Sequence, residues 1–256
     1  LNNASVTKNE TGGNGGGIRA DVSSDFMITQ GYLDGNVAAG NGNGMWIGTS
    51  NVKLVNNYLQ TGENDDFYLA YRSNPLLMYK SFTNASRVYK VYPSEEYVAG
   101  DIVVHPTGLS TDASPYLRNF ISIRPGTVLE RRYPDIILGR IIFLDGETGL
   151  DPVFNGDGSI TYQTDDLGVL HDGTAPDKAF ATFAASKRVL GSAPGSIYVS
   201  GPVEISQDET WSLGEQQYMR RYCGFTVSAD TAYPPFKGEF ATYTAWLYRE
   251  IRKYDN

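Results

Sequence analysis

The chain has 256 residues, 41% of them hydrophobic, and its 21 Lys and Arg stand against 29 Asp and Glu for a formal net charge of −8. This length can bury the core of one or two domains, and without a concentrated basic face we expect no nucleic acid partner. The single cysteine, Cys223, excludes a disulfide framework, and no apolar run approaches the ~20 residues of a membrane-spanning helix, so we expect no membrane insertion.

Two segments near the start of the chain repeat each other. A Gly-x-Gly-apolar element at Gly15–Ile18 returns at Gly42–Met45, and ITQGYLDGN at 28–36 returns as LVNNYLQTG at 54–62. Alternating apolar residues in these segments predict strands, and the Gly, Asn and Asp clusters between them predict turns. A strand-rich repeat of this length predicts a parallel β-solenoid, in which each coil buries its apolar face against its neighbours.

The glycine-rich stretch TGGNGGGI at 11–18 does not fit a nucleotide-binding loop. No G-x-G-x-x-G register fits it, no strand-glycine-helix unit surrounds it, and no Gly-Lys-Ser/Thr follows. We interpret the glycines as corners of solenoid coils, where a residue without Cβ can adopt positive φ.

Three regions follow one another along the chain. Residues 1–85 are predicted to be β-helix coils. Residues 86–146 hold strand candidates of irregular spacing (RVYKVYP, GDIVVHP, NFISIRPG and DIILGRIIFLDG), which predict a small β module or linker. Residues 147–256 begin with acidic loops and continue with a helix at 174–190, capped by Thr174, and further strands.

Several segments resemble the β-helical repeat regions of large Gram-positive surface proteins with an adhesin-like character. The stretch DGTAPDKAFATFAASKRVLGSAPGSIYVSGPVEISQDETWSL at 172–213 is similar to the opening segment of their helices. GGNGGGIRA and NGNGMWIG resemble their glycine-rich coils, and YVAGDIVVHPTGLSTDASPYLRNF with IILGRIIFLDG resembles the β module that follows such a helix.

The resemblance implies a mainly β fold, with right-handed parallel β-helix segments, a capping helix and a small β module between them. It implies an extracellular, cell-surface structural or adhesive module with neighbouring repeat units, and a host or cell-surface glycan or protein as partner. In this chain the opening segment follows the glycine-rich coils, so we expect one unit of a larger, tandem-repeat protein. The alternative for this order is a segment that holds the tail of one β-helix and the start of the next. The alternative function is that of a carbohydrate-active or carbohydrate-binding β-helix, such as a polysaccharide hydrolase, a lyase or a phage tailspike-like protein.

Aromatic residues around the coils suggest a carbohydrate-binding face, because exposed rings in a row can stack on sugar rings. The candidates are Trp46, Tyr32 and Tyr68, with Tyr58 and Tyr71 nearby. The alternative is that most of these rings pack in the core or between coils.

The acidic stretch DPVFNGDGSITYQTDDL at 151–167 resembles a calcium loop in part. Asn155 and Asp157 stand at the third and fifth ligand positions, but Val153 and Thr164 occupy the first and twelfth. A calcium site would therefore need an irregular loop in which Asp151, Asp165 or Asp166 replaces the missing ligands, and an acidic surface turn is the alternative. Calcium is the one cofactor that the sequence suggests.

Evidence for catalysis is sparse, so the sequence leans away from an enzyme. Asp65 and Asp66 could supply paired carboxylates for glycoside chemistry, but neighbouring residues of a strand point to opposite faces. The two histidines, His105 and His171, lie in separate segments without a surrounding motif.

Overall fold

The computed structural model describes the residues in the ranges 1–21, 25–83, 86–203 and 213–221. The chain divides into two compact units, Leu1–Gly139 and Arg140–Asn256. The described residues form a mainly β structure with few helices, as the sequence predicts. The strands predicted after residue 221, and most of ETWSL at 209–213, lie outside the described residues, as does Cys223.

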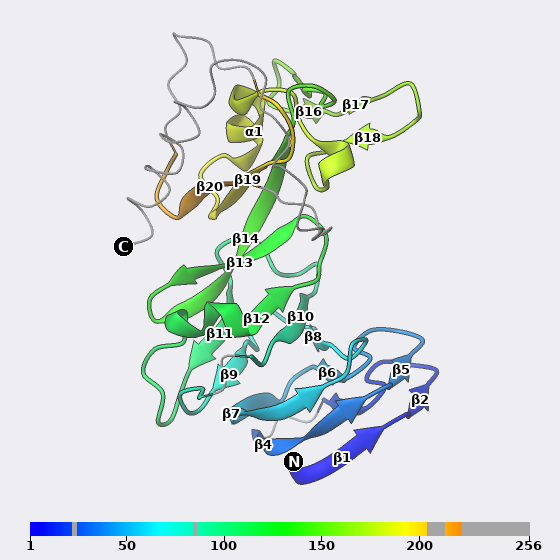
Figure 1. Cartoon of the computed structure of the whole chain (residues 1–256), viewed down its shortest axis with the longest axis vertical. Helices are drawn as coiled ribbons and strands as arrows, with labels where there is room; N and C mark the ends of the chain where they lie inside the picture. Colours follow the sequence, from blue (N-terminus) through cyan, green and yellow to red (C-terminus); the bar gives the residue numbers. More distant parts are fainter. Residues whose placement is uncertain (22–24, 84–85, 204–212, 222–256) are drawn as a thin grey trace, which may run out of the picture. The chain divides into compact units, whose positions relative to one another are not determined.

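The first unit is a parallel β-solenoid of about four turns (Figure 1), which confirms the predicted β-helix. One sheet runs in the order β1 (Asn2–Thr7), β4 (Asp25–Asp34), β7 (Asn51–Thr61), β9 (Leu76–Met78) and β11 (Ile102–Pro106). The second runs in the order β3 (Ile18–Ala20), β6 (Met45–Ile47), β8 (Phe67–Leu69), β10 (Tyr89–Pro93) and β12 (Phe120–Ser122). The short strands β2 (Glu10–Thr11) and β5 (Val37–Ala38) pair at the corner between them.

Apolar side chains stack in register inside the coils. Ile28 pairs with Leu54 and Leu54 with Met78 on the first sheet, and all three are fully buried. On the second sheet Met45 lies beside Phe67 in the same way. Each buried side chain of this size contributes about 1.5–3 kcal/mol relative to an exposed one, so the period-2 pattern of the strands sets which face turns inward.

The glycine repeat forms a stacked corner of two coils. Gly15 and Gly42 both adopt positive φ, of 76° and 74°. The backbone N–H of Gly16 donates to Gly42 O at 3.0 Å, and a Cβ on Gly16 would lie 2.5 Å from Asn43 O. A side chain at this position would force neighbouring coils apart, which explains the glycines in structural terms and needs no phosphate ligand.

The second predicted repeat pairs differently along its length. Ile28 stands beside Leu54 as the alignment predicts, but a β-bulge between Ile28 and Gln30 shifts the later register. Tyr32 therefore pairs with Gln60 and not with Tyr58. The alignment of residues 28–36 with 54–62 is wrong beyond the bulge, because a bulge inserts residues without a signal in the apolar pattern.

The strands of 86–146, assigned to a separate module from the sequence, continue the solenoid sheets. β10 pairs in parallel with β8, and β11 with β9. The regular coils end where β11 pairs in antiparallel fashion with β14 (Asp135–Leu144), which also pairs with β13 (Thr127–Arg132). The 3₁₀ turn η1 (Ser114–Asn119) contacts β12 and β13. The division between units falls inside β14, after Gly139.

The second unit contains the end of β14, which pairs in parallel with β19 (Gly195–Val199), and β19 pairs with β20 (Gln217–Arg221). The helix α1 (Phe183–Leu190) covers this sheet. Its buried residues Phe183, Val189 and Leu190 share one core cluster with Ile197 and Met219. No described helix is long and apolar enough to cross a membrane.

The helix is shorter than the sequence predicts. Instead of one helix over 174–190, the chain forms a 3₁₀ turn, η2 (Pro176–Lys178), before α1. Phe180 lies between η2 and α1 and interrupts the helix, because its N–H donates to Phe143 O at 2.9 Å and it forms a β-bridge with Leu144. Thr182, and not Thr174, is the N-cap, and its hydroxyl accepts from Ala185 N.

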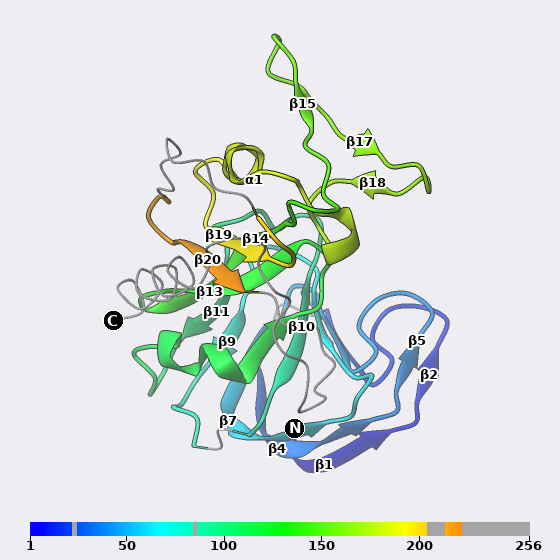
Figure 2. The same cartoon turned by 45° about the horizontal axis from the view of Figure 1, so that its top comes forward.

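Two hairpins project from the second unit (Figure 2). The first pairs β15 (Val153–Phe154) with β16 (Ile160–Thr161), and the second pairs β17 (Gln163–Thr164) with β18 (Leu170–His171). Phe154 and Tyr162 anchor their bases on the core of the unit, and the Tyr162 ring stacks on Phe180 at 6.2 Å.

Candidate functional site

A row of aromatic and charged side chains crosses the outer face of the second solenoid sheet. β-sheet register places Arg19 beside Trp46, Trp46 beside Tyr68 and Tyr68 beside Tyr92, one from each of four successive coils. We call these four residues, with Tyr71, the aromatic row. The structure thus brings two predicted residues, Trp46 and Tyr68, into one row, because equivalent positions of stacked coils lie one strand spacing apart.

Contacts along the row are ring to ring. The Tyr68 and Tyr92 rings stack at 5.4 Å with 20° between their planes, and the Trp46 and Tyr71 rings meet edge to face at 6.5 Å. The Arg19 guanidinium lies 5.1 Å from the Trp46 ring centre, a cation–π distance, and also bonds Asp21 at 2.7 Å. The rings therefore contribute to the stability of the stacked coils, whether or not they also bind a ligand.

Accessibility differs along the aromatic row. Trp46 is 6% exposed, whereas Tyr71 is 39% exposed. Burial raises the pKa of the Tyr68 hydroxyl above its ordinary value, and the neighbouring Tyr92 and Glu95 add to the shift. Tyr71 is the most exposed ring of the row, Tyr68 and Tyr92 are partly exposed, and the Arg19 guanidinium lies over Trp46 and bonds Asp21. An apolar ring face with charged groups near it can contact the face and the hydroxyls of a sugar.

The third predicted carbohydrate-binding residue, Tyr32, lies on the other sheet. It belongs to β4, between Ser5 and Gln60 of the neighbouring strands, so it does not join Trp46 and Tyr68. The carboxylate of Asp34 raises the pKa of its hydroxyl.

Arg19 and Tyr92 are members of the row that the sequence analysis missed. Arg19 precedes Trp46 by one coil, and Tyr92 follows Tyr68 by one coil. The signal for Tyr92 was the coil period itself, which was not extended past residue 85 because the spacing becomes irregular there.

Three successive coils also carry a polar ladder of Asn9, Asn36 and Asp65, in which Asn9 is exposed and Asn36 and Asp65 are buried. Asn36 Nδ2 donates to Asp65 Oδ1 at 2.8 Å and to Val6 O at 3.0 Å, while Asn9 Nδ2 donates to Asn36 Oδ1 at 3.0 Å. Asp65 Oδ2 accepts from Gly35 N at 2.9 Å. Asn36 and Asp65 are each 1% exposed, so the ladder satisfies polar groups that would be costly to bury alone.

The Asp65–Asp66 pair consequently has separate structural roles. Asp65 belongs to the polar ladder, whereas Asp66 Oδ1 accepts from Asn43 N at 2.7 Å. Burial raises the pKa of the Asp66 carboxyl. Each carboxylate ties its loop to the coil before it.

The residues proposed as calcium ligands are each engaged locally. Asp151 accepts bonds from Ala181 N and from the Thr182 backbone and hydroxyl, at 2.6–2.9 Å. Asp157 accepts two bonds from Ser159, and Asn155 Nδ2 donates to Ser159 Oγ at 2.9 Å.

The fourth proposed ligand, Asp165, fixes a different hairpin. Its Oδ1 accepts from Leu167 N at 2.9 Å and Val169 N at 2.8 Å. These bonds lower the pKa of the Asp165 carboxyl, as the bonds from Ser159 do for Asp157. Among the described residues, no three His, Cys, Asp or Glu side chains gather as a metal-binding group.

Both histidines contact an aspartate. His105 Nδ1 lies 2.7 Å from Asp135 Oδ1 beside the antiparallel β11–β14 pair. His171 is buried, with Nδ1 2.9 Å from Ala179 O and Nε2 3.5 Å from Asp165 Oδ2. The two pairs lie in different units and hold strands or turns together.

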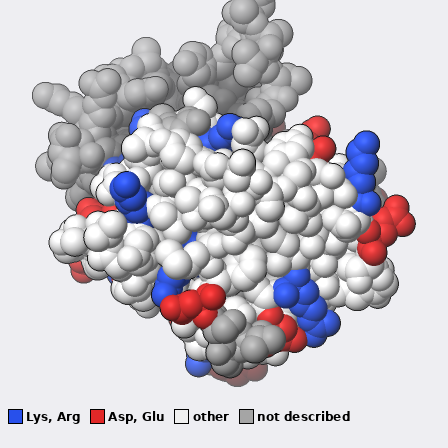
Figure 3. All heavy atoms as spheres, turned by 90° about the horizontal axis from the view of Figure 1, so that it is seen from below, with Lys and Arg blue, Asp and Glu red and all other residues white. Residues whose placement is uncertain are grey.

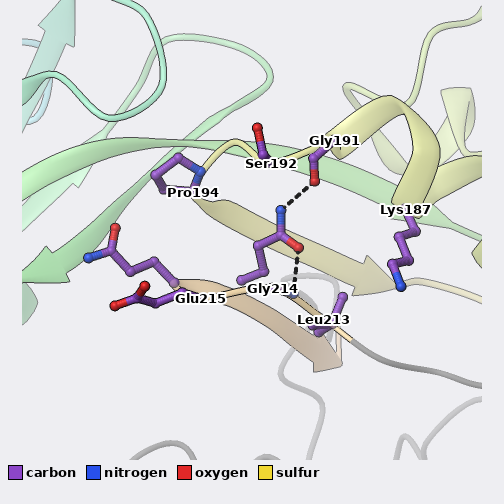
Figure 4. A pocket seen from close by; sticks show the side chains of 9 residues that line it. Lys187, Gly191, Ser192, Pro194, Leu213, Gly214 and Glu215 are labelled. Atoms are coloured by element: carbon purple, nitrogen blue, oxygen red, sulfur yellow. Dashed lines mark hydrogen bonds between the residues drawn. The ribbon is translucent and has the colours of Figure 1, made fainter.

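A hollow of about 670 Å³ lies between the end of α1 and β20 (Figure 4). Gln217 crosses it: its Nε2 donates to Gly191 O at 2.7 Å and to Ala193 O at 2.9 Å, and its Oε1 accepts from Gly214 N. The amide of Gln217 is thus used in joining the loop after α1 to β20, which leaves Lys187 and Glu215 as the charged side chains of its wall.

No family model, curated protein or solved structure matches the chain. The functional argument therefore depends on the geometry of the solenoid and its surfaces.

Proposed function

We propose that the chain is a structural and adhesive module of a bacterial cell-surface protein, in which the β-solenoid acts as a stiff spacer within a larger, repeat-containing molecule. The observation that supports this proposal best is the continuity of side-chain ladders through successive coils. Apolar, aromatic and polar ladders all run from coil to coil. In a solenoid each coil contacts only its neighbours, so the molecule can lengthen in one dimension while successive coils continue the same core.

The proposal is tested on intact cells of the source organism. Antibodies raised against the chain are expected to label unpermeabilised cells, and brief external protease treatment is expected to remove the label while a cytoplasmic marker survives. Labelling that appears only after permeabilisation would contradict a surface location.

For the adhesive role we propose a glycan ligand at the aromatic row. The supporting observation is the exposed Tyr71 ring, which meets the edge of Trp46, while the Arg19 guanidinium lies over the Trp46 ring and bonds Asp21. A pyranose ring can pack on an aromatic face while its hydroxyls bond charged groups at the rim.

Tyr71→Ala is the informative variant, because truncation of the buried Trp46 would cost about 3–5 kcal/mol of folding free energy as well. On a glycan array, Tyr71→Ala is expected to weaken the strongest signals about tenfold. Tyr58→Ala, which removes a half-exposed ring from the other sheet, is the matched control. Equal binding by both variants and the unaltered chain would contradict the glycan site.

A further inference from the structure

The negative charge of the chain is concentrated in one segment. Residues 141–177 contain eight Asp and Glu and no Lys or Arg, so this segment accounts for the whole formal charge of −8. The other 21 acidic residues equal the 21 Lys and Arg in number. On the face of the molecule in Figure 3, by contrast, charged side chains of both signs are scattered toward the edge.

Much of the acidic segment forms the two hairpins, and these hairpins also expose apolar side chains. The exposed apolar residues are Val153, Ile160, Leu167 and Leu170. A two-stranded hairpin has no second layer to cover its faces and is at best marginally stable alone. Exposed apolar side chains gathered on such elements mark a surface that a partner covers.

Local hydrogen bonds shape the backbone at the tip of the second hairpin. Leu167 is 88% exposed, yet its N–H and that of Val169 are fixed by Asp165 Oδ1. Gly168 adopts a φ of 82° and its N–H donates to Asp165 O at 3.0 Å. Asp166 stands beside Leu167 without an ion-pair partner in the described part of the chain. The tip therefore presents an exposed leucine side chain next to a carboxylate.

A surface of complementary character lies at the end of the first unit. The exposed Arg118 and Arg131 lie near the ends of η1 and β13, two elements that contact each other, and Tyr133 follows β13 directly in the chain. Tyr133 is 77% exposed. Of the ion pairs found among the described residues, none includes these arginines. We call this the arginine surface.

We propose that the acidic hairpins of one copy of this chain dock on the arginine surface of a second copy. Asp166 and Leu167 at the hairpin tip would meet the exposed Arg131 and Tyr133 of the second copy. Because the two surfaces differ, the contact can form once, joining copies head to tail, or twice around a two-fold axis. The proposal stands on charge and exposure, so its failure leaves the surface location of the module untouched.

The test measures association of the full chain by sedimentation velocity over a range of protein and salt concentrations. The unaltered chain is expected to self-associate at low salt and to dissociate as NaCl is raised, because the screening length falls from about 30 Å at 0.01 M to about 3 Å at 1 M. A chain that stays monomeric at low salt and high protein concentration would overturn the proposal.

Charge reversals then identify the surfaces. Asp166→Arg and Arg131→Glu are each expected to weaken self-association at least about tenfold, because each places like charges in contact. An equimolar mixture of the two variants is expected to associate again, since it restores complementary charges at every contact. Arg72→Glu, at another exposed arginine of the first unit, is the matched control and should associate like the unaltered chain.

Two results would overturn the assignment of the surfaces. One is self-association that survives both reversals, which would mean that other surfaces pair. The other is a mixture that remains as weakly associated as its two components.

Discussion

The solenoid and the acidic hairpins use polar side chains in opposite ways. In the solenoid, many side-chain hydrogen bonds join residues about one coil apart: Asn9 to Asn36 and Asn36 to Asp65 lie 27 and 29 positions apart in sequence. In the hairpins, Asp157 bonds Ser159 two positions away and Asp165 bonds Val169 four positions away. Long-range bonds form only when coils stack, whereas a local bond can form and open by itself.

This difference indicates that cooperative stability is a property of the solenoid and not of the hairpins. Loss of one long-range buried contact is felt by the coils on both sides, because each coil is stabilised by its neighbours. Loss of a hairpin bond is confined to a turn, which can open without exposing the core. The solenoid therefore behaves as a scaffold, and the hairpins as surface elements with their own low stability.

The largest effect is expected from breaking the polar ladder. Asn36→Ala removes the amide that bonds the Asp65 carboxylate and leaves a buried acceptor short of a donor. We expect the free energy of unfolding to fall by about 3 kcal/mol, measured by urea denaturation. Asn155→Ala, which removes an amide that bonds its own hairpin, is the control and should change the value by less than about 0.5 kcal/mol. Equal losses would contradict the comparison.

An intermediate loss of stability is expected at alkaline pH, and it originates in the buried tyrosines of the solenoid. Burial raises the pKa of the Tyr89 and Tyr97 hydroxyls, which donate to Leu59 O and Tyr71 O at 3.2 and 3.0 Å. Unfolded tyrosine ionises near pH 10, so ionisation favours the unfolded chain and stability falls as the pH rises above that value. The urea midpoint should drop between pH 9 and 11. In the Tyr89→Phe variant the drop of the urea midpoint should be smaller. A urea midpoint of the unaltered chain that does not change with pH would contradict this prediction.

The smallest expected effect is seen in acid, where the pKa values of one carboxyl group in the solenoid and one in a hairpin shift in opposite directions. Burial raises the pKa of Asp66 in the solenoid, whereas hydrogen bonds lower that of Asp165 in the hairpin. The contribution of Asp66 to stability is present at low pH and is lost as the pH rises through its folded pKa. The contribution of Asp165 is present above the ordinary pKa of aspartate and is lost as the pH falls through its lowered value. Carboxyl NMR titration should place the two midpoints on opposite sides of the ordinary value, and coincident midpoints would remove the contrast.

The sequence predicted the solenoid because its signal is repetition. Gly15 and Gly42 mark equivalent corners, and Ile28 and Leu54 mark equivalent inward positions, each about one coil apart. The signal weakened after residue 85, where the coils continue with irregular spacing, and Tyr92 was therefore missed. The helix at 174–190 was predicted too long because Phe180 bonds to Phe143, far away in sequence, in place of the preceding helical turn.

The sequence by itself determined the parallel β architecture, the glycine corners and the concentration of charge in residues 141–177, because these follow from local composition and periodicity. The tertiary structure alone decided which aromatic residues share a row, that Asp65 is buried beside Asn36, and that Asp151 caps the turn before α1 instead of joining Asp157. Such placements depend on the register between coils, which a single β-bulge can shift, and on contacts between residues far apart in the chain.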